Sequence, residues 1–277
     1  MKRTLSILLC HALLLTLPLT ASAAKLSYAD PAGDDFGPGT YTYPTNSVYT
    51  PGSFDLRKVE LKTKGSKVEI KVTLGAAIED PWNSKGWTPS GQGFSLQMVQ
   101  LYIDTDGKPG SGHTKTLPGI NAVFDAKDGW ERAIVISPQA GSRLRSEVAA
   151  KAGALKAGVV VPTKVVVRGK TLVATVKKKD LGGALSSSWG FQAIVQSNEG
   201  YPDKDDLLSR KVNEFGGDHR FGGGNDWNCD PHVLDILAGA GKGGADEKEL
   251  QKSALSYTCG DGGASVKMAT LPMVRTP

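Results

Sequence analysis

Alternating apolar and polar positions recur along the chain and predict a fold built from β-strands. Residues 59–64 and 67–74 alternate on either side of Gly65-Ser66, a pattern typical of a hairpin with one buried face and one lysine-rich, solvated face. Residues 95–103 are more uniformly apolar, as expected for a strand in the middle of a sheet. Further strands are predicted at residues 131–136, 159–168, 171–176 and 191–196.

Helical periodicity is weak and is confined to residues 146–157 and 245–254. Glycine is frequent, with 34 residues, and proline adds 15, so turns must separate many short elements. No proline-rich or serine-rich linker divides the chain. Together these features predict an all-β fold, specifically a single β-sandwich domain with one or two short helices.

The first residues carry the pattern of a secretory signal peptide. Lys2 and Arg3 precede an apolar stretch at residues 5–19, and Ala21-Ser22-Ala23 places small residues before a cleavage site. A membrane anchor is the alternative, but the apolar stretch is shorter than the roughly 20 residues that a span needs. We therefore expect residues 1–23 to be a signal peptide and residues 24–277 to form one domain. The mature protein would have no transmembrane segment and would be exported to a periplasm, the cell surface or the medium.

Export changes the interpretation of the cysteines, because Cys10 lies within the signal peptide. The remaining pair, Cys229 and Cys259, is expected to form a disulfide in an oxidising compartment. Such a bond closes a loop of about 30 residues and is worth roughly 3 kcal/mol in the chain-entropy model. Two buried free thiols are the alternative, and no Cys/His spacing suggests zinc.

The charge distribution suggests an interaction with anions only weakly. The formal net charge is +5, and residues 143–179 contain ten Lys or Arg residues and a single acid, Glu147. A basic face could attract anionic wall polymers or lipid headgroups. The same lysines could instead form the solvated side of strands and protect sheet edges. Aromatic residues that could stack on bases are absent there, so no nucleic-acid partner is expected.

Two aspartate-rich loops are candidates for a calcium site. Asp34 and Asp35 follow Asp30 in a Gly/Pro-rich loop, and Asp104 and Asp106 follow the apolar strand. Hard cations such as Ca²⁺ prefer several oxygen ligands on irregular backbone. The second loop resembles the start of an EF-hand, but lysines stand at its fifth and twelfth positions, so the full pattern fails. Aspartate also serves turns without a metal.

Long polar loops that contain aromatic residues suggest a sugar-binding site. The loops at residues 198–206 and 215–227 combine glycines, carboxylates and aromatic rings, and Trp82, Trp87, Tyr201 and Trp227 all fall in predicted loops. Sugar hydroxyls need hydrogen bonds, and sugar ring faces stack on aromatic side chains. Loop tryptophans can equally cap a hydrophobic core, so the sequence leaves both roles open.

No catalytic pattern is recognisable. The three histidines of the mature chain do not stand in HExxH spacing, and no GxSxG elbow occurs. The segment 239–244 resembles a phosphate-binding loop superficially but lacks its first glycine and its final hydroxyl. Carboxylate pairs for glycoside hydrolysis could be assembled from many acidic residues, so their presence discriminates nothing.

Several ordered blocks resemble a known family. The blocks GDDFGPGTYTYPT, PGSFDL, GFSLQMVQLYIDTDG, SSSWGFQAIVQSNEGY and FGGGNDWNCDPHVLDIL are similar to the glucodextranase C-terminal domain family, over nearly all of residues 25–274. This is a DOMON-like group similar to family 9 carbohydrate-binding modules. The resemblance implies a β-sandwich, found attached to secreted glucodextranases and amylopullulanases, that binds carbohydrate or helps to hold the enzyme at the cell surface.

The resemblance also implies a structural calcium role for Asp34, Asp35, Asp104 and Asp106. The chain departs from the family pattern at residues 225–229 and at the Cys229/Cys259 pair.

The sequence therefore predicts an exported, non-catalytic protein that binds α-glucan or a cell-envelope polysaccharide through Trp82, Trp87, Tyr201 and Trp227. A separate glycoside hydrolase is an expected partner. A structural protein anchored to anionic envelope polymers is the main alternative, and a glycoside hydrolase is a weaker one.

Overall fold

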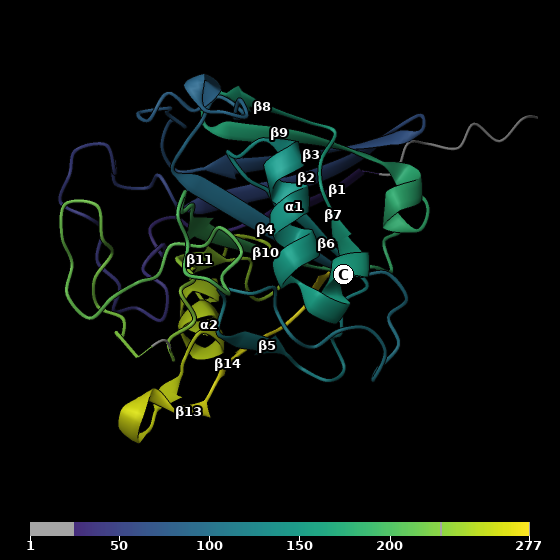
Figure 1. Ribbon diagram of the computed structural model, residues 1–277. Coiled ribbons are helices and arrows are strands. Elements are labelled where there is room, and N and C mark those ends of the chain that lie inside the picture. The colour runs from purple at the N-terminus through teal and green to yellow at the C-terminus, as the bar shows by residue number, and fades with distance from the viewer. Residues whose placement is uncertain (1–24, 228, 277) are drawn as a thin grey trace, which may run out of the picture.

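Extended strands and irregular loops account for most of the computed structural model, which describes residues 25–227 and 229–276. Figure 1 shows several β-sheets and a few short helices, which confirms the prediction of a mainly β fold. The predicted signal peptide lies outside the described residues. Within the described part of the chain, no helix is long and apolar enough to cross a bilayer.

The first large sheet has five strands, each antiparallel to its neighbours. In spatial order they are β1 (Lys25–Ala29), β2 (Leu56–Lys64), β3 (Lys67–Leu74), β9 (Thr171–Lys177) and β8 (Lys164–Arg168). The β2–β3 hairpin turns at Gly65-Ser66, where the sequence predicted it. Its inward residues are buried and its outward lysines are solvated, as the alternation required.

The second large sheet has six strands and is built around two long central ones. In spatial order it contains β11 (Asp235–Ile236), β10 (Gly190–Ser197), β4 (Gln97–Asp104), β6 (Arg132–Ile136) and β7 (Val159–Val160), and β15 (Val274–Arg275) also pairs with β10. Only β6 and β7 run parallel to each other. Every residue of β4 and of β10 is buried.

Two hydrophobic clusters explain this complete burial. Val99 and Leu101 of β4 belong to a cluster that also contains the inward side chains of the five-stranded sheet. Met98 and Tyr102, which alternate with them, belong to a second cluster with Leu144 of α1 (Gly141–Lys151). Figure 1 shows α1 lying across the six-stranded sheet. The uniformly apolar pattern of residues 95–103 thus reflects a strand covered on both faces.

The strand predicted over residues 159–168 is instead divided between β7 and β8, which belong to different sheets. Short elements complete the fold. They are β5 (Ala122–Phe124) with its parallel partner β14 (Ala269–Leu271), β12 (Thr258–Cys259) with β13 (Ser265–Lys267), α2 (Glu247–Ala254), and the 3₁₀ helices η1 (Ser84–Gly86), η2 (Gly153–Gly158), η3 (Lys178–Leu181) and η4 (Asp261–Gly263).

The first helix begins earlier than its periodicity suggested. The expectation was a helix over residues 146–157, but α1 starts at Gly141 and ends at Lys151. Gly153 adopts a φ of +53°, which stops the α-helix, and the following segment continues as 3₁₀ turns. The helix expected at residues 245–254 is present as α2.

Two long-range ties close the molecule at its C-terminal end. Cys229 and Cys259 form the disulfide that the sequence predicted, with Cα atoms 5.8 Å apart. Beyond it, β15 adds to β10 in the six-stranded sheet, and the Tyr28 hydroxyl of β1 lies 3.0 Å from the Thr276 hydroxyl. The first described strand and the last described residue are therefore joined directly.

Candidate functional site

The antiparallel order of the six-stranded sheet gathers several loops at one end. The start of β4 lies beside the ends of its two neighbours, because Gln97 pairs with Ser197 of β10 and Val99 pairs with Ile136 of β6. The loops that precede β4 and follow β6 and β10 must therefore meet. Binding sites commonly form on such loops, since a rigid sheet holds them in place.

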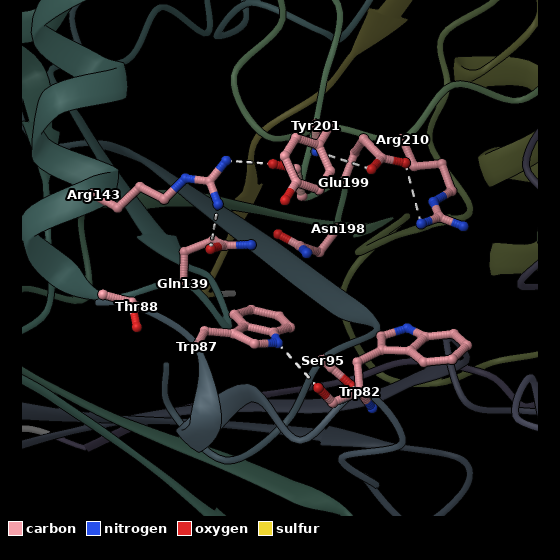
Figure 2. A pocket seen from close by; sticks show the side chains of 11 residues that line it. Trp82, Trp87, Thr88, Ser95, Gln139, Arg143, Asn198, Glu199, Tyr201 and Arg210 are labelled. Atoms are coloured by element: carbon pink, nitrogen blue, oxygen red, sulfur yellow. Dashed lines mark hydrogen bonds and ion pairs between the residues drawn. The ribbon is translucent and has the colours of Figure 1, made fainter. Parts of the chain in front are cut away.

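These loops surround a hollow of about 430 Å³, which we call the first hollow (Figure 2). Its volume is within the range of small-molecule sites. The residues that line it are Trp82, Trp87, Thr88, Ser95, Gln139, Arg143, Asn198, Glu199, Gly200, Tyr201 and Arg210. Figure 2 shows the two indole rings on one side, Arg143 and Tyr201 on the opposite side, and the carboxamides of Gln139 and Asn198 between them.

The aromatic side of the first hollow is held by local hydrogen bonds. Asp80 accepts a hydrogen bond of 2.8 Å from the Ser84 backbone N–H and one of 2.9 Å from its hydroxyl, which fixes the turn between the tryptophans. The indole N–H of Trp87 donates to the Trp82 carbonyl at 3.0 Å. The Trp82 ring also meets His219 edge-on, with centroids 5.2 Å apart. Both indole faces are thus positioned before any ligand arrives.

The polar side contains two arginines whose charges are already used within the protein. Arg143 donates to the Gln139 side-chain oxygen at 3.0 Å and to the Gly200 carbonyl, which ties α1 to the loop after β10. Arg210 forms an ion pair of 3.1 Å with Glu199. Glu199 in turn accepts a hydrogen bond of 3.0 Å from the Tyr201 backbone N–H. The hollow therefore offers fixed donors and acceptors without a free charge that would demand an anion.

Two buried amide groups between these sides have unused hydrogen-bonding capacity. Gln139 and Asn198 are 3% and 4% exposed, yet Gln139 Nε2 and Asn198 Oδ1 have no hydrogen-bond partner among the described residues. Buried polar groups are normally satisfied, and an unsatisfied one costs about 1–3 kcal/mol. Both atoms lie just beneath the lining of the hollow, so a small rotation of either side chain would let a ligand hydroxyl supply the missing partner.

The structure brings together three of the four aromatic residues that the sequence suggested. Trp82, Trp87 and Tyr201 line the first hollow. Tyr201 stands at its border and is 94% exposed. Trp227 does not line it; the residue is 65% exposed, and its Cβ and backbone carbonyl lie beside Gly263 of η4.

Sequence reasoning missed the polar half of the hollow. Asn198 and Glu199 stood in a loop that the sequence singled out, but without an assigned role. Gln139 and Arg143 gave no signal, because only the pairing of β4 with β6 brings them near the tryptophans.

A second candidate site is a cluster of three buried carboxylates, which we call the buried triad. It consists of Asp30 after β1, Asp34 in the following loop and Asp235 in β11, whose nearest oxygens all lie within 4.8 Å of one another. Asp235 is held in place by backbone N–H groups, from Leu56 at 2.6 Å and from Ile236 at 2.8 Å. The pairing of sheet segments thus brings together residues about 200 positions apart in sequence.

Within the described part of the chain the buried triad has no ion-pair partner, although the charge of Lys248 lowers the pKa of Asp34 from a longer range. No Lys, Arg or His side chain there forms an ion pair with any of the three, and both carboxylate oxygens of Asp30 lack a hydrogen-bond partner. Burial first, and then the neighbouring carboxylates, raise the pKa of Asp30 to about 9 and that of Asp34 to about 6. The pKa of Asp235 is raised for the same reasons. Such a cluster needs protons or a cation.

Asp35, which the sequence grouped with Asp34, points elsewhere. Its carboxylate accepts a hydrogen bond from the Tyr43 hydroxyl. Burial raises the pKa of Asp35, and the Tyr43 hydrogen bond opposes that rise. Asp30 stood in the same aspartate-rich loop of the sequence, whereas nothing in the sequence suggested Asp235 as a metal ligand.

The second aspartate-rich loop forms a different cluster, which we call the Arg275 cluster. Asp104, Asp106 and Glu131 also have oxygens within 4.8 Å of one another. Here Arg275 donates to Asp104 Oδ2 at 2.6 Å and to Asp128 at 3.1 Å. The remaining Asp104 oxygen accepts backbone N–H groups from Asp106 and Gly107. Asp106 is exposed, and hydrogen bonds from the Lys108 N–H and the Ser111 hydroxyl lower its pKa.

The loops of the sheet form a hollow that is lined by aromatic rings and by hydrogen-bonded polar groups. This arrangement defines a β-rich binding module. The family model described as the C-terminal binding module, SLH-like, of glucodextranase matches residues 26–273. The chain therefore belongs to this family, which confirms the resemblance seen in the sequence. The family is a non-catalytic binding module of that enzyme. A comparison with curated proteins finds no match.

Proposed function

We propose that this protein binds an α-glucan in the first hollow without transforming it. The observation that carries the proposal is the first hollow itself, in which Trp82 and Trp87 face buried amides with spare hydrogen-bonding capacity. The apolar faces of sugar rings stack on indoles, and their hydroxyls take the place of water on the amides. A glucan is favoured because the family is a binding module of glucodextranase.

The charges in the hollow support a neutral ligand and argue against hydrolysis. Arg143 pairs with Glu147 at 3.7 Å and Arg210 pairs with Glu199 at 3.1 Å, so neither requires an anionic sugar. Glycoside hydrolysis normally uses two carboxyl groups, one on each side of the bond that is cleaved. Among the residues that line the hollow, Glu199 is the only carboxylate, and Arg210 and the Tyr201 N–H hold it.

We further propose that the buried triad holds a structural Ca²⁺. The fit rests on the two unpartnered oxygens of Asp30, which are buried beside two further carboxylates. Oxygen ligands from Asp30, Asp34 and Asp235 are the type that Ca²⁺ prefers. When bound, the cation would neutralise charges that otherwise repel one another, and so would connect β1, its following loop and β11.

The remaining parts of the proposal concern location and architecture. We propose that residues 1–23 direct export and are removed, consistent with a disulfide in the folded part. Residues 24–277 would then act as one domain. A DOMON-like sandwich, similar to family 9 carbohydrate-binding modules, is supported by the hydrophobic cluster that the two large sheets share.

Affinity electrophoresis of residues 24–277 on dextran, pullulan, glycogen and β-glucans tests the binding function. We expect retardation by at least one α-glucan, and loss of that retardation in Trp87→Ala because a stacking face is removed. Trp227→Ala is the matched control, since its exposed indole lies outside the hollow. Thermal melts verify that each variant folds.

Either of two results contradicts the proposal. Unretarded migration of the wild-type protein on every α-glucan would exclude α-glucan binding. Retardation that survives Trp87→Ala but disappears in Trp227→Ala would move the site to the disulfide-linked loop.

A specific surface favours a second candidate function, anchoring to anionic envelope polymers. By strand register, the outward side of the five-stranded sheet carries nine basic residues and only two acidic ones, Glu60 and Glu69. The basic residues are Lys25, Lys58, Lys62, Lys64, Lys67, Lys71, Lys164, Arg168 and Lys177.

Edge protection alone does not explain this face, because Lys67 and Lys71 belong to β3, which has a neighbour on each side. Anchoring predicts binding to immobilised polygalacturonate that weakens with salt and does not respond to Trp87→Ala. A separate glycoside hydrolase held at the same surface would then be the protein's partner.

A further inference from the structure

A second hollow adjoins the first on the side of Tyr201. It also has a volume of about 430 Å³. Its lining shares Glu199, Tyr201 and Arg210 with the first hollow, so the same three side chains border both spaces. Its other walls come from the loops at residues 202–213 and 219–226, which cross the same end of the molecule.

The boundary between the two hollows is well defined. Arg210 is fixed by its ion pair with Glu199 and by hydrogen bonds to the Tyr49 hydroxyl at 2.9 Å and the His219 carbonyl at 2.6 Å. His219, which lines the second hollow, packs against Trp82 of the first. A ligand that passes from one hollow to the other crosses the border formed by Glu199, Tyr201 and Arg210, of which Tyr201 is almost fully exposed.

The chemistry of the second hollow complements that of the first. Lys211 forms ion pairs with Asp203 at 2.5 Å and with Asp206 at 3.9 Å. Asp206 is more than nine-tenths buried, and its Oδ2 has no hydrogen-bond partner among the described residues. Asn213 and Arg220 add further donors and acceptors to the wall. The second hollow thus offers hydrogen bonds, whereas the first also offers two indole faces.

We propose that the ligand is an extended oligosaccharide chain that occupies both hollows and crosses Tyr201 between them. This inference rests on the proposed glucan-binding function. It adds that the recognised segment of the glucan is long enough to fill both hollows. The first hollow holds sugar units by stacking and hydrogen bonds. The next units contact the Tyr201 ring, and the units beyond them exchange hydrogen bonds with Asn213 and Arg220.

Titration calorimetry with two oligosaccharide series tests the inference on residues 24–277. The probes are the maltose series and the isomaltose series, each from the disaccharide to the heptasaccharide. We expect affinity to rise with length and then to reach a plateau. In the double variant Asn213→Ala/Arg220→Ala, affinity for the longest oligomer should fall roughly tenfold, the effect of losing one or two hydrogen bonds. Affinity for the shortest oligomer that binds should not change.

Lys204→Ala is the matched control, because it removes one exposed positive charge from the same loop and lines neither hollow. Affinity that does not depend on length overturns the inference, as does an equal loss at every length in the double variant. A normal length dependence that survives the double variant assigns the additional units to another surface and also overturns it. Binding of short oligomers that Trp87→Ala abolishes would preserve the proposed function in each of these cases. If no oligomer binds, both this inference and the proposed glucan-binding function are wrong.

Discussion

The two carboxylate clusters each bring three acidic groups within 4.8 Å of one another but balance their charges differently. In the Arg275 cluster, one guanidinium group donates to Asp104 and to Asp128, and backbone N–H groups take the remaining Asp104 oxygen. In the buried triad, Asp30 has two unpartnered oxygens and no ion pair within the described residues. The first cluster carries its own cation, whereas the second requires one from solution or must hold protons.

This difference shows why an aspartate-rich loop does not by itself define a metal site. Both loops gave the same signal in the sequence. The two loops differ in how deeply their carboxylates are buried, and in whether a distant part of the chain places a basic residue beside them. Arg275 does so only because β15 pairs with β10, far along the chain. Removing the Arg275 side chain should therefore destabilise the Arg275 cluster, whereas adding a cation should stabilise the buried triad.

The largest expected effect is that of calcium on the buried triad. In millimolar Ca²⁺ the melting temperature should exceed that in chelator by about 5–10 °C. This follows because a ligand at a hundredfold excess over its Kd stabilises by about 2.7 kcal/mol, and each kcal/mol shifts a domain of this size by about 2–4 °C. Differential scanning calorimetry measures the shift. Superimposable melts with and without chelator would exclude a calcium site of this affinity.

Asp30→Asn should change the melting temperature in opposite directions in chelator and in calcium. In chelator the variant should melt higher than the wild type at neutral pH, because folding then no longer requires a proton to be bound at Asp30, whose pKa is raised to about 9. In calcium it should melt lower, because a ligand is lost, and its calcium-induced shift should fall below about 2 °C. Asp106→Asn serves as a control in the other cluster. A destabilisation of the same size in both conditions would mean that Asp30 acts only as a structural residue.

Arg275→Met tests the Arg275 cluster from the opposite direction. Removing the guanidinium leaves Asp104 and Asp128 unpaired, so we expect a loss of about 1–3 kcal/mol. This is less than for a fully buried pair, because the Arg275 side chain is about one-third exposed. Urea unfolding gives the free energy. Lys127→Met, at an exposed pair nearby, should be neutral; equal effects of the two variants would refute the special role of Arg275.

The smallest effect is expected at Asp106. Its carboxylate is exposed and supports the turn through Lys108 and Ser111. Asp106→Asn should shift the melting temperature by no more than about 2 °C, as for other surface substitutions. A larger shift that appears only in calcium would instead show that the Arg275 cluster also binds the ion.

Local patterns determined which parts of the fold were predictable from the sequence. The β2–β3 hairpin followed from strict alternation around Gly65-Ser66, and β4 followed from a largely apolar run. The order of strands in the sheets was not predictable, since β3 pairs with β9 across about 100 residues. The start of α1 was missed because Gly141 and its neighbours have no strong helical signal, and tertiary contacts of Leu144 and Val148 stabilise this turn.

The candidate sites follow the same rule. Trp82, Trp87 and Tyr201 could be suggested because aromatic residues in polar loops are unusual. Gln139 could not, because its importance depends on where β6 ends relative to β4. Likewise Asp34 stood in an obvious motif, but Asp235 joins it only through the pairing of β11 with β10.

The way in which β15 and Thr276 close the structure has a consequence for the order of folding. The last described residues complete the six-stranded sheet, provide the cation for Asp104 and reach the Tyr28 hydroxyl of the first strand. A nascent chain that still lacks these residues cannot form the native sheet. Completion of the six-stranded sheet therefore has to wait until these residues have been synthesised.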